Sequence, residues 1–153
     1  MSGWLVDTRL FRHLSPGAGG RKPSFRDWVS GNTEPLYLST MSLFVIETEI
    51  EKFRAHRQHG RAAEMDEWLG WLVAHYSHRI HPVDAEVARR AGALMRRSRD
   101  YPRGATFQNL LLAGTAQIHG HSLLTDAVNL FRPWAGIELW DPFDGRLPRK
   151  GGA

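Results

Sequence analysis

Short apolar runs alternate along the chain with longer segments in which apolar residues recur at every third or fourth position. The short runs are typical of buried strands, and the periodic segments are typical of helices with one apolar face. Because helical segments separate the strands, the order indicates an α/β fold in which helices cover both faces of a mainly parallel sheet. The predicted strands are residues 4–7, 36–40, 79–84, 121–125 and 137–143.

The helical segments carry recognisable start signals and apolar faces. Residues 25–31 form a short candidate helix, and the next helix carries apolar residues at positions 43, 46, 50 and 53. Asp84 has the position of an N-cap. The buried faces of two helices are predicted to be Met65, Leu69, Leu72 and Val73, and Val87, Ala91, Leu94 and Met95. The last long helix is apolar but opens with two neutral amides, Gln108 and Asn109.

Length and composition favour a single globular domain. The chain has 153 residues, of which 42% are hydrophobic and 24% are charged, and this is ordinary for a protein with a substantial core. We place the domain at residues 1–145 and interpret the polar stretch 146–153 as a flexible C-terminal tail. The sequence has no signal-peptide pattern and no apolar stretch near the roughly 20 residues that span a bilayer. We therefore expect a soluble, cytoplasmic protein with no membrane partner.

The net charge indicates which class of partner the chain binds, and the absence of cysteine excludes some kinds of site. A formal net charge of +4 and a pI of about 10.0 favour a polyanionic partner, either nucleic acid or an acidic peptide. Four arginines line one flank of a predicted helix, which suits either phosphate binding or a solvated face: Arg89, Arg90, Arg96 and Arg97. The sequence contains no cysteine, which excludes disulfides and thiolate metal sites.

Candidate chemistry gathers where the predicted strands end, because ligands of open α/β sheets bind at the carboxyl ends of the strands. Asp7 directly follows a buried strand, where it would either hold a divalent cation or cap the next helix. Thr125 and Asp126 end a later strand. The histidines at positions 75, 78, 81, 119 and 121 are interpreted as structural or surface residues, because no metalloprotease motif is present. The sequence also lacks a phosphate-binding glycine loop and a nucleophile elbow.

Four stretches occur in an informative order: "WLVDTRLF", "LYLSTMSLFVIETEIEKF", "RIHPVDAEVARRAGALMRR" and "NLLLAGTAQIHGHSLLTDAVNLF". In this order they resemble the PIN domain over nearly the whole chain, in particular the VapC/FitB-like ribonuclease toxins of bacterial toxin–antitoxin pairs. The resemblance implies a PIN-like three-layer α/β/α sandwich. It also implies a Mg²⁺- or Mn²⁺-dependent endoribonuclease activity, a homodimer and an antitoxin-like protein partner.

The resemblance also identifies this chain's counterparts of the family's metal-binding acids. That family holds Mg²⁺ or Mn²⁺ with about four acids at the strand ends, since hard cations prefer oxygen ligands. The first acid falls on Asp7, and the Asn that usually follows two residues later is Arg9. The remaining acids fall on Val45, Asn109 and Ala127. The amide at the helix start therefore stands where the family has a carboxylate, and Arg9 adds a charge that opposes a bound cation.

Two hypotheses follow from this pattern. In the first, the chain is a pseudo-nuclease without a metal cofactor, which binds RNA through Arg9, Arg96 and Arg97, or binds an antitoxin-like or other protein. In the second, it is an active Mg²⁺- or Mn²⁺-dependent endoribonuclease with a shifted site. Asp7 and Asp126 would then be the metal ligands, and Glu49, one helical turn beyond Val45, would be a substitute acid. Whether the chain is an enzyme stays open at this point.

Overall fold

The structure is a computed structural model that describes residues 3–17, 25–32, 35–96, 106–134 and 136–144. Its strands form one five-stranded sheet in the order β3-β2-β1-β4-β5. They are β1 (Trp4–Val6), β2 (Leu36–Ser39), β3 (Ile80–His81), β4 (Ser122–Leu124) and β5 (Leu139–Trp140). Each neighbouring pair is parallel, which confirms the predicted sheet. The predicted tail at residues 146–153 lies outside the described residues.

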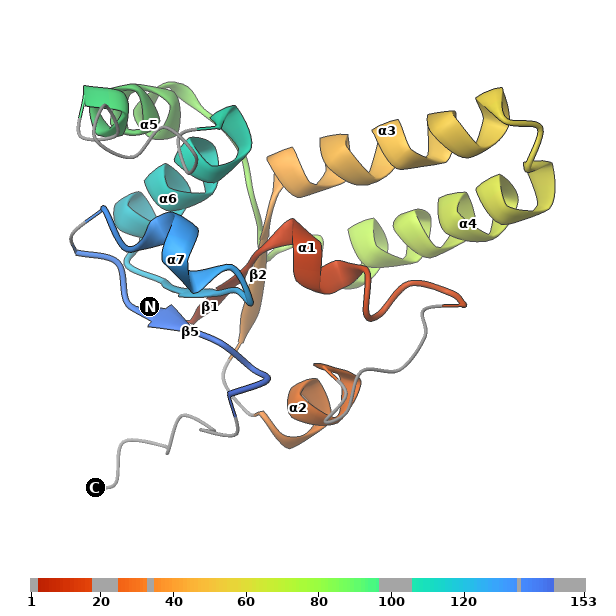
Figure 1. Ribbon diagram of the computed structural model, residues 1–153, viewed down its shortest axis with the longest axis horizontal. Coiled ribbons are helices and arrows are strands. Elements are labelled where there is room, and N and C mark those ends of the chain that lie inside the picture. Colours follow the sequence, from red (N-terminus) through yellow and green to blue (C-terminus); the bar gives the residue numbers. More distant parts are fainter. Residues whose placement is uncertain (1–2, 18–24, 33–34, 97–105, 135, 145–153) are drawn as a thin grey trace.

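Helices cover both faces of the sheet and make a three-layer α/β/α sandwich (Figure 1). One face packs against α1 (Thr8–Phe11), α2 (Phe25–Gly31), α3 (Thr40–Ala55) and α4 (His59–His75). The other face packs against α5 (Ala85–Met95), α6 (Phe107–His119) and α7 (Val128–Phe131). The fold class predicted from the sequence is therefore confirmed.

Strand β1 separates the two halves of the core. Trp4 and Val6 point into the cluster formed with α1–α4, whereas Leu5 points into the cluster formed with α5 and α6. Successive side chains of a strand point to opposite faces of its sheet. A central strand is buried on both faces, and this explains why its sequence is apolar without interruption.

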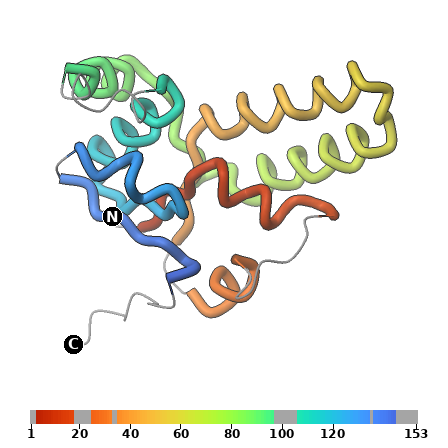
Figure 2. The backbone as a smooth tube through the Cα atoms, in the orientation of Figure 1, coloured from red at the N-terminus to blue at the C-terminus, as the bar shows by residue number. Residues whose placement is uncertain are grey.

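Two long helices, α3 and α4, run side by side as a hairpin that extends away from the sheet (Figure 2). The hydroxyl of Ser39 caps α3 by accepting a hydrogen bond from the amide of Met41 at 3.1 Å. The hairpin is held by apolar residues that lie within the same core cluster, among them Ile50 and Leu69.

Helix α6 is held tightly against α5, and this positions its first turn. A Cβ atom on Gly114 would lie 3.1 Å from the backbone of both Ala91 and Val87, so any larger residue would require the two helices to shift apart. Thr106 caps the helix by accepting from the amide of Asn109 at 3.2 Å, and Gly120 ends it with φ of 65°. Asn109 is thereby fixed at the carboxyl end of the sheet.

Some local predictions were wrong. Val73 and Met95 are 42% and 43% exposed, although they were predicted to be buried. Val73 lies next to the Met65–Leu69–Leu72 stripe but is turned away from it, and Met95 is the last residue of α5, where packing ends. Helix α7 was not predicted, because four residues are too few to show a period. Among the described residues, no helix combines the length and apolarity that a membrane crossing requires.

Candidate functional site

Asp7 lies directly after β1 and is fully buried. Its amide donates to the carbonyl of Leu124 at 2.9 Å, which fixes the residue between the ends of β1 and β4. Its carboxylate caps α1 by accepting from the amide of Arg9 at 3.1 Å. The hydroxyl of Thr125 donates to the same carboxylate at 2.7 Å. The capping role that the sequence left open is therefore observed.

Arg9 bridges Asp7 and Asn109 with its guanidinium group. One nitrogen, Nη1, donates to Asp7 Oδ2 at 2.5 Å, and the other, Nη2, donates to Asn109 Oδ1 at 2.6 Å. The guanidinium carbon also lies 5.9 Å from the ring centre of Phe131. A cation of the chain itself therefore stands between the two side chains that the resemblance assigns to the family's first and third acids.

The other two positions that the resemblance assigns to acids, Val45 and Ala127, carry none. Val45 is half-buried on α3, and Ala127 donates its amide to the hydroxyl of Thr125 at 2.9 Å. The first turn of α3 is tied to α1 by a 2.8 Å hydrogen bond between the hydroxyls of Thr8 and Ser42. The backbone frame expected from the resemblance is thus present.

These residues do not fit a divalent cation. Mg²⁺ and Mn²⁺ sites need several oxygen ligands with negative charge, and this position offers one carboxylate, Asp7, and one amide oxygen, from Asn109. Both oxygens accept from Arg9. Two unit charges of the same sign about 4 Å apart repel by roughly 4 kcal/mol at an effective dielectric of about 20, so the guanidinium opposes a metal ion here.

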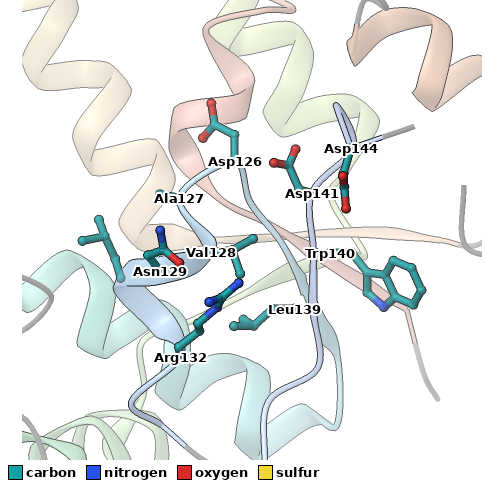
Figure 3. Close-up of a pocket in the computed structure, with 10 residues that line it drawn as sticks. Asp126, Ala127, Val128, Asn129, Arg132, Leu139, Trp140, Asp141 and Asp144 are labelled. Atoms are coloured by element: carbon teal, nitrogen blue, oxygen red, sulfur yellow. The ribbon is translucent and has the colours of Figure 1, made fainter. Parts of the chain in front are cut away.

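The proposed substitute acids have other neighbours. Glu49 pairs with Arg12 at 3.0 Å. Asp126 lines a pocket of about 560 Å³ together with Asp141 and Asp144, on the loops that follow β4 and β5 (Figure 3). Within the described ranges, no group of three or more histidine, aspartate or glutamate side chains has an arrangement that could hold a metal ion.

Three histidines that the sequence does not group together, His81, His119 and His121, lie in contact with one another in the structure. His81 and His121 share a hydrogen bond of 2.8 Å between their Nε2 atoms, and His119 stacks on His81 with ring centres 3.7 Å apart. Tyr37 stacks on His121 at 4.1 Å. Burial, together with the positive charge of neighbouring histidines, lowers the pKa of His81 and of His121 to about 4. The structural interpretation of these histidines agrees with this packing.

The predicted nucleic-acid contacts are only partly described. Arg96 is exposed and is the C-cap residue that follows α5, and Arg97 lies outside the described residues. Sequence reasoning did not single out Arg12, which pairs with Glu49. A signal was present, because Arg12 lies three residues after Arg9 on a helix that an aspartate caps.

No protein-family model and no curated protein sequence matches the chain, but solved structures do. A chain of FitAcB from Neisseria gonorrhoeae matches with a TM-score of 0.77 and 18% identity, over 92% of this chain and 99% of that chain. DNA-bound VapBC from Salmonella typhimurium matches with a TM-score of 0.64 and 18% identity, over 93% and 99% of the two chains.

VapBC2 from Rickettsia felis, bound to a promoter DNA fragment, gives a TM-score of 0.63 and 16% identity, over 92% of this chain and 100% of that chain. Identities this low establish the fold. The chain therefore has the VapC/FitB-like PIN fold of these toxin–antitoxin structures.

Proposed function

We propose that the chain is a pseudo-nuclease of the toxin–antitoxin PIN type, which acts by binding a partner and not by metal-dependent RNA cleavage. The observation that carries this proposal is the bridge from Arg9 to both Asp7 and Asn109. In a metal-dependent member of the fold these two positions would share a cation that activates water. Here they share a guanidinium, which has no water ligand to activate.

The arrangement is also self-consistent without a metal. The buried Asp7 carboxylate accepts from the Arg9 amide, the Arg9 guanidinium and the Thr125 hydroxyl. A buried carboxylate requires such partners, since its desolvation is otherwise costly. The site is therefore satisfied as a rigid structural centre, and binding chemistry has to come from surfaces around it.

The solved relatives support a protein partner. They are FitAB and VapBC assemblies, and one is described as a toxin–antitoxin complex from Klebsiella pneumoniae. We propose an antitoxin-like protein as the principal partner of this chain, and a homodimer as its assembly. RNA binding through Arg9, Arg96 and Arg97 is the competing mode of binding, and sedimentation of the chain with and without single-stranded RNA measures both RNA binding and self-association.

Calorimetry with Mn²⁺ tests the loss of metal chemistry. Wild type and Asp7→Asn are titrated side by side and then assayed for cleavage of single-stranded RNA. We expect no Mn²⁺ binding and no cleavage that depends on Asp7. Micromolar Mn²⁺ binding that Asp7→Asn abolishes, together with Mn²⁺-dependent cleavage, would overturn the proposal.

A rebuilt variant serves as the positive control. The four substitutions Arg9→Asn, Val45→Glu, Asn109→Asp and Ala127→Asp restore the acids and the neutral residue that the resemblance places at these positions. We expect this variant to gain Mn²⁺ binding, because it removes the bridging cation and adds three carboxylates. A rebuilt variant that folds but binds no metal would show that Arg9 is not what prevents metal binding.

The second candidate, an active enzyme with a shifted site, draws support from the acidic pocket beside the β4 end. Asp126, Asp141 and Asp144 line that pocket (Figure 3). The discriminating measurement is RNA cleavage by Asp126→Asn and Glu49→Gln. Cleavage by the wild type that both variants lose would favour the shifted site, and cleavage by neither wild type nor variant favours the pseudo-nuclease.

A further inference from the structure

A groove runs between the end of α1 and the α3–α4 hairpin. Two adjoining hollows make it up, and both are lined by Arg12, Glu49 and Met65. The smaller hollow reaches Val45 and Trp68. The larger one, about 460 Å³, reaches the outer part of the hairpin. The groove therefore starts beside Val45 and leads away along the hairpin, whose two helices run side by side (Figure 2).

The groove carries an excess of positive charge. Its cations are Arg12, Lys52 and Arg61, and its acid is Glu49, which Arg12 already pairs at 3.0 Å. Lys52 is exposed and makes no ion pair within the part of the chain that the structure describes. Arg61 pairs with Glu64 at 3.7 Å, so the excess positive charge of the groove is about one and belongs to Lys52.

Three other acids of the hairpin gather around Arg54. Arg54 lies within 4.0 Å of the carboxylates of Glu47, Glu51 and Asp66. Residues two apart on a helix point in roughly opposite directions, so Glu47 and Glu51 face away from Glu49. The positive charge of the groove is therefore not cancelled by these exposed acids.

The floor of the groove is apolar and its wall is held in place. Met65 is 4% exposed, and Phe53 packs against the same core. Arg61 donates to the carbonyl of Pro16 and lies over the ring of Phe53, 5.6 Å from its centre. With one face covered by a guanidinium, this ring is a poor platform for a stacked base, but the floor suits aliphatic side chains.

We propose that this groove binds an acidic, apolar segment of a protein partner. Carboxylates of the segment pair with Arg12 and Lys52, and its apolar side chains pack over Phe53 and Met65. The inference rests on the proposed function, in which the chain acts by binding a protein. The Asp7 carboxylate is already paired with Arg9, so an arginine of the partner would find no unpaired carboxylate there. The positive groove favours an acidic segment of the partner instead.

The test selects a phage-displayed random peptide library on the purified chain in EDTA. We expect the enriched peptides to combine aspartate or glutamate with apolar residues. A labelled peptide made from the enriched sequences is then titrated into wild type and Arg12→Glu/Lys52→Glu. We expect the peptide to bind the variant about tenfold more weakly than wild type. The matched control is Arg89→Glu/Arg90→Glu, which changes the net charge equally on exposed positions of α5 and is expected to bind like wild type.

Three outcomes would overturn the proposal. The enriched peptides could be basic, both double variants could lose binding equally, or no peptide could be enriched while oligouridylate binds in a way that needs Arg12 and Lys52. Thermal melts confirm that each variant folds, and Arg12→Gln/Lys52→Gln provides a milder pair if the charge reversal unfolds the chain. Because EDTA removes divalent metal, failure here leaves the Mn²⁺ and cleavage results unchanged, and those results leave peptide binding unchanged.

Discussion

Arg9 donates from its guanidinium to the carboxylate of Asp7 at 2.5 Å, although only one residue separates them in the sequence. The short helix α1 makes this possible, because Asp7 caps it and Arg9 stands in its first turn. The same guanidinium then reaches Asn109, 100 positions away. An ion pair within one turn and a contact across the fold are thus made by one side chain, and this gives Arg9 a structural role.

Replacing Arg9 by Ala should destabilise the fold. The change leaves the buried Asp7 carboxylate without its cation and removes the hydrogen bond from Arg9 to Asn109. Removing one partner of a buried pair costs about 3–5 kcal/mol, and because the Arg9 side chain is 27% exposed we expect about 2 kcal/mol after allowing for solvent. Urea denaturation measures the change. Arg9→Lys keeps the positive charge but cannot bridge Asp7 and Asn109, so its stability should lie between those of wild type and Arg9→Ala. An Arg9→Ala variant as stable as wild type would contradict the structural role.

The architecture could be predicted from the sequence because its signals are local. The apolar runs at β1 and β2 and the N-cap at Asp84 depend on neighbouring residues, and each is present in the structure. The resemblance extended this to the backbone positions of Asp7 and Asn109, which lie together as expected.

What the sequence did not predict depends on contacts between distant segments. That Arg9 is a cation was readable from the sequence, but its reach to Asn109 required α1 and α6 to be placed in three dimensions. The pairing of Arg12 with Glu49 likewise joins residues 37 positions apart. The stacking of His81 on His119 needs β3 to lie near the end of α6, and nothing in the spacing of these histidines indicates it.

Replacing Thr125 by Val should cost stability at the same centre. The hydroxyl donates to Asp7 and accepts from the amide of Ala127, and valine of similar shape does neither. The buried Asp7 carboxylate then loses one of its three donors and the amide of Ala127 loses its acceptor, so we expect a loss of about 1–3 kcal/mol. Thr48→Val is the matched control, since its hydroxyl donates only to a carbonyl of its own helix, that of Val45. Equal losses in the two variants by urea denaturation would argue against a special role for Thr125.

Two helical glycines should respond in opposite directions to alanine. Gly114→Ala places a Cβ at 3.1 Å from the backbone of α5, which cannot move without shifting the helix, so we expect a loss of about 1–3 kcal/mol. Gly92→Ala meets nothing within 4 Å, and should stabilise α5 by about 0.5–1 kcal/mol. Thermal melts of the two variants measure both changes. A Gly114→Ala variant that melts at or above the wild-type temperature would mean that α5 and α6 are less closely packed than described.

The histidine stack should make the fold sensitive to acid. The pKa of His81 and of His121 is lowered to about 4 by burial and by neighbouring histidines, whereas an unfolded histidine has a pKa near 6.5. Between these values the unfolded chain binds more protons than the folded chain, so the free energy of unfolding is unaffected above about pH 6.5 and falls as the pH drops toward 4. Since the two rings share one hydrogen bond and His81 is only half-buried, we expect a loss of about 2 kcal/mol over this range.

Urea denaturation between pH 7 and pH 4 tests this dependence, with His81→Phe/His121→Phe as the informative variant. Phenylalanine keeps rings in the stack with Tyr37 and His119 but cannot take up a proton, so the slope of stability against pH should flatten in this interval. His59→Gln changes an exposed histidine at the start of α4 and should keep the wild-type slope. If the double variant lost stability with pH as steeply as wild type, the acid sensitivity would not come from His81 and His121.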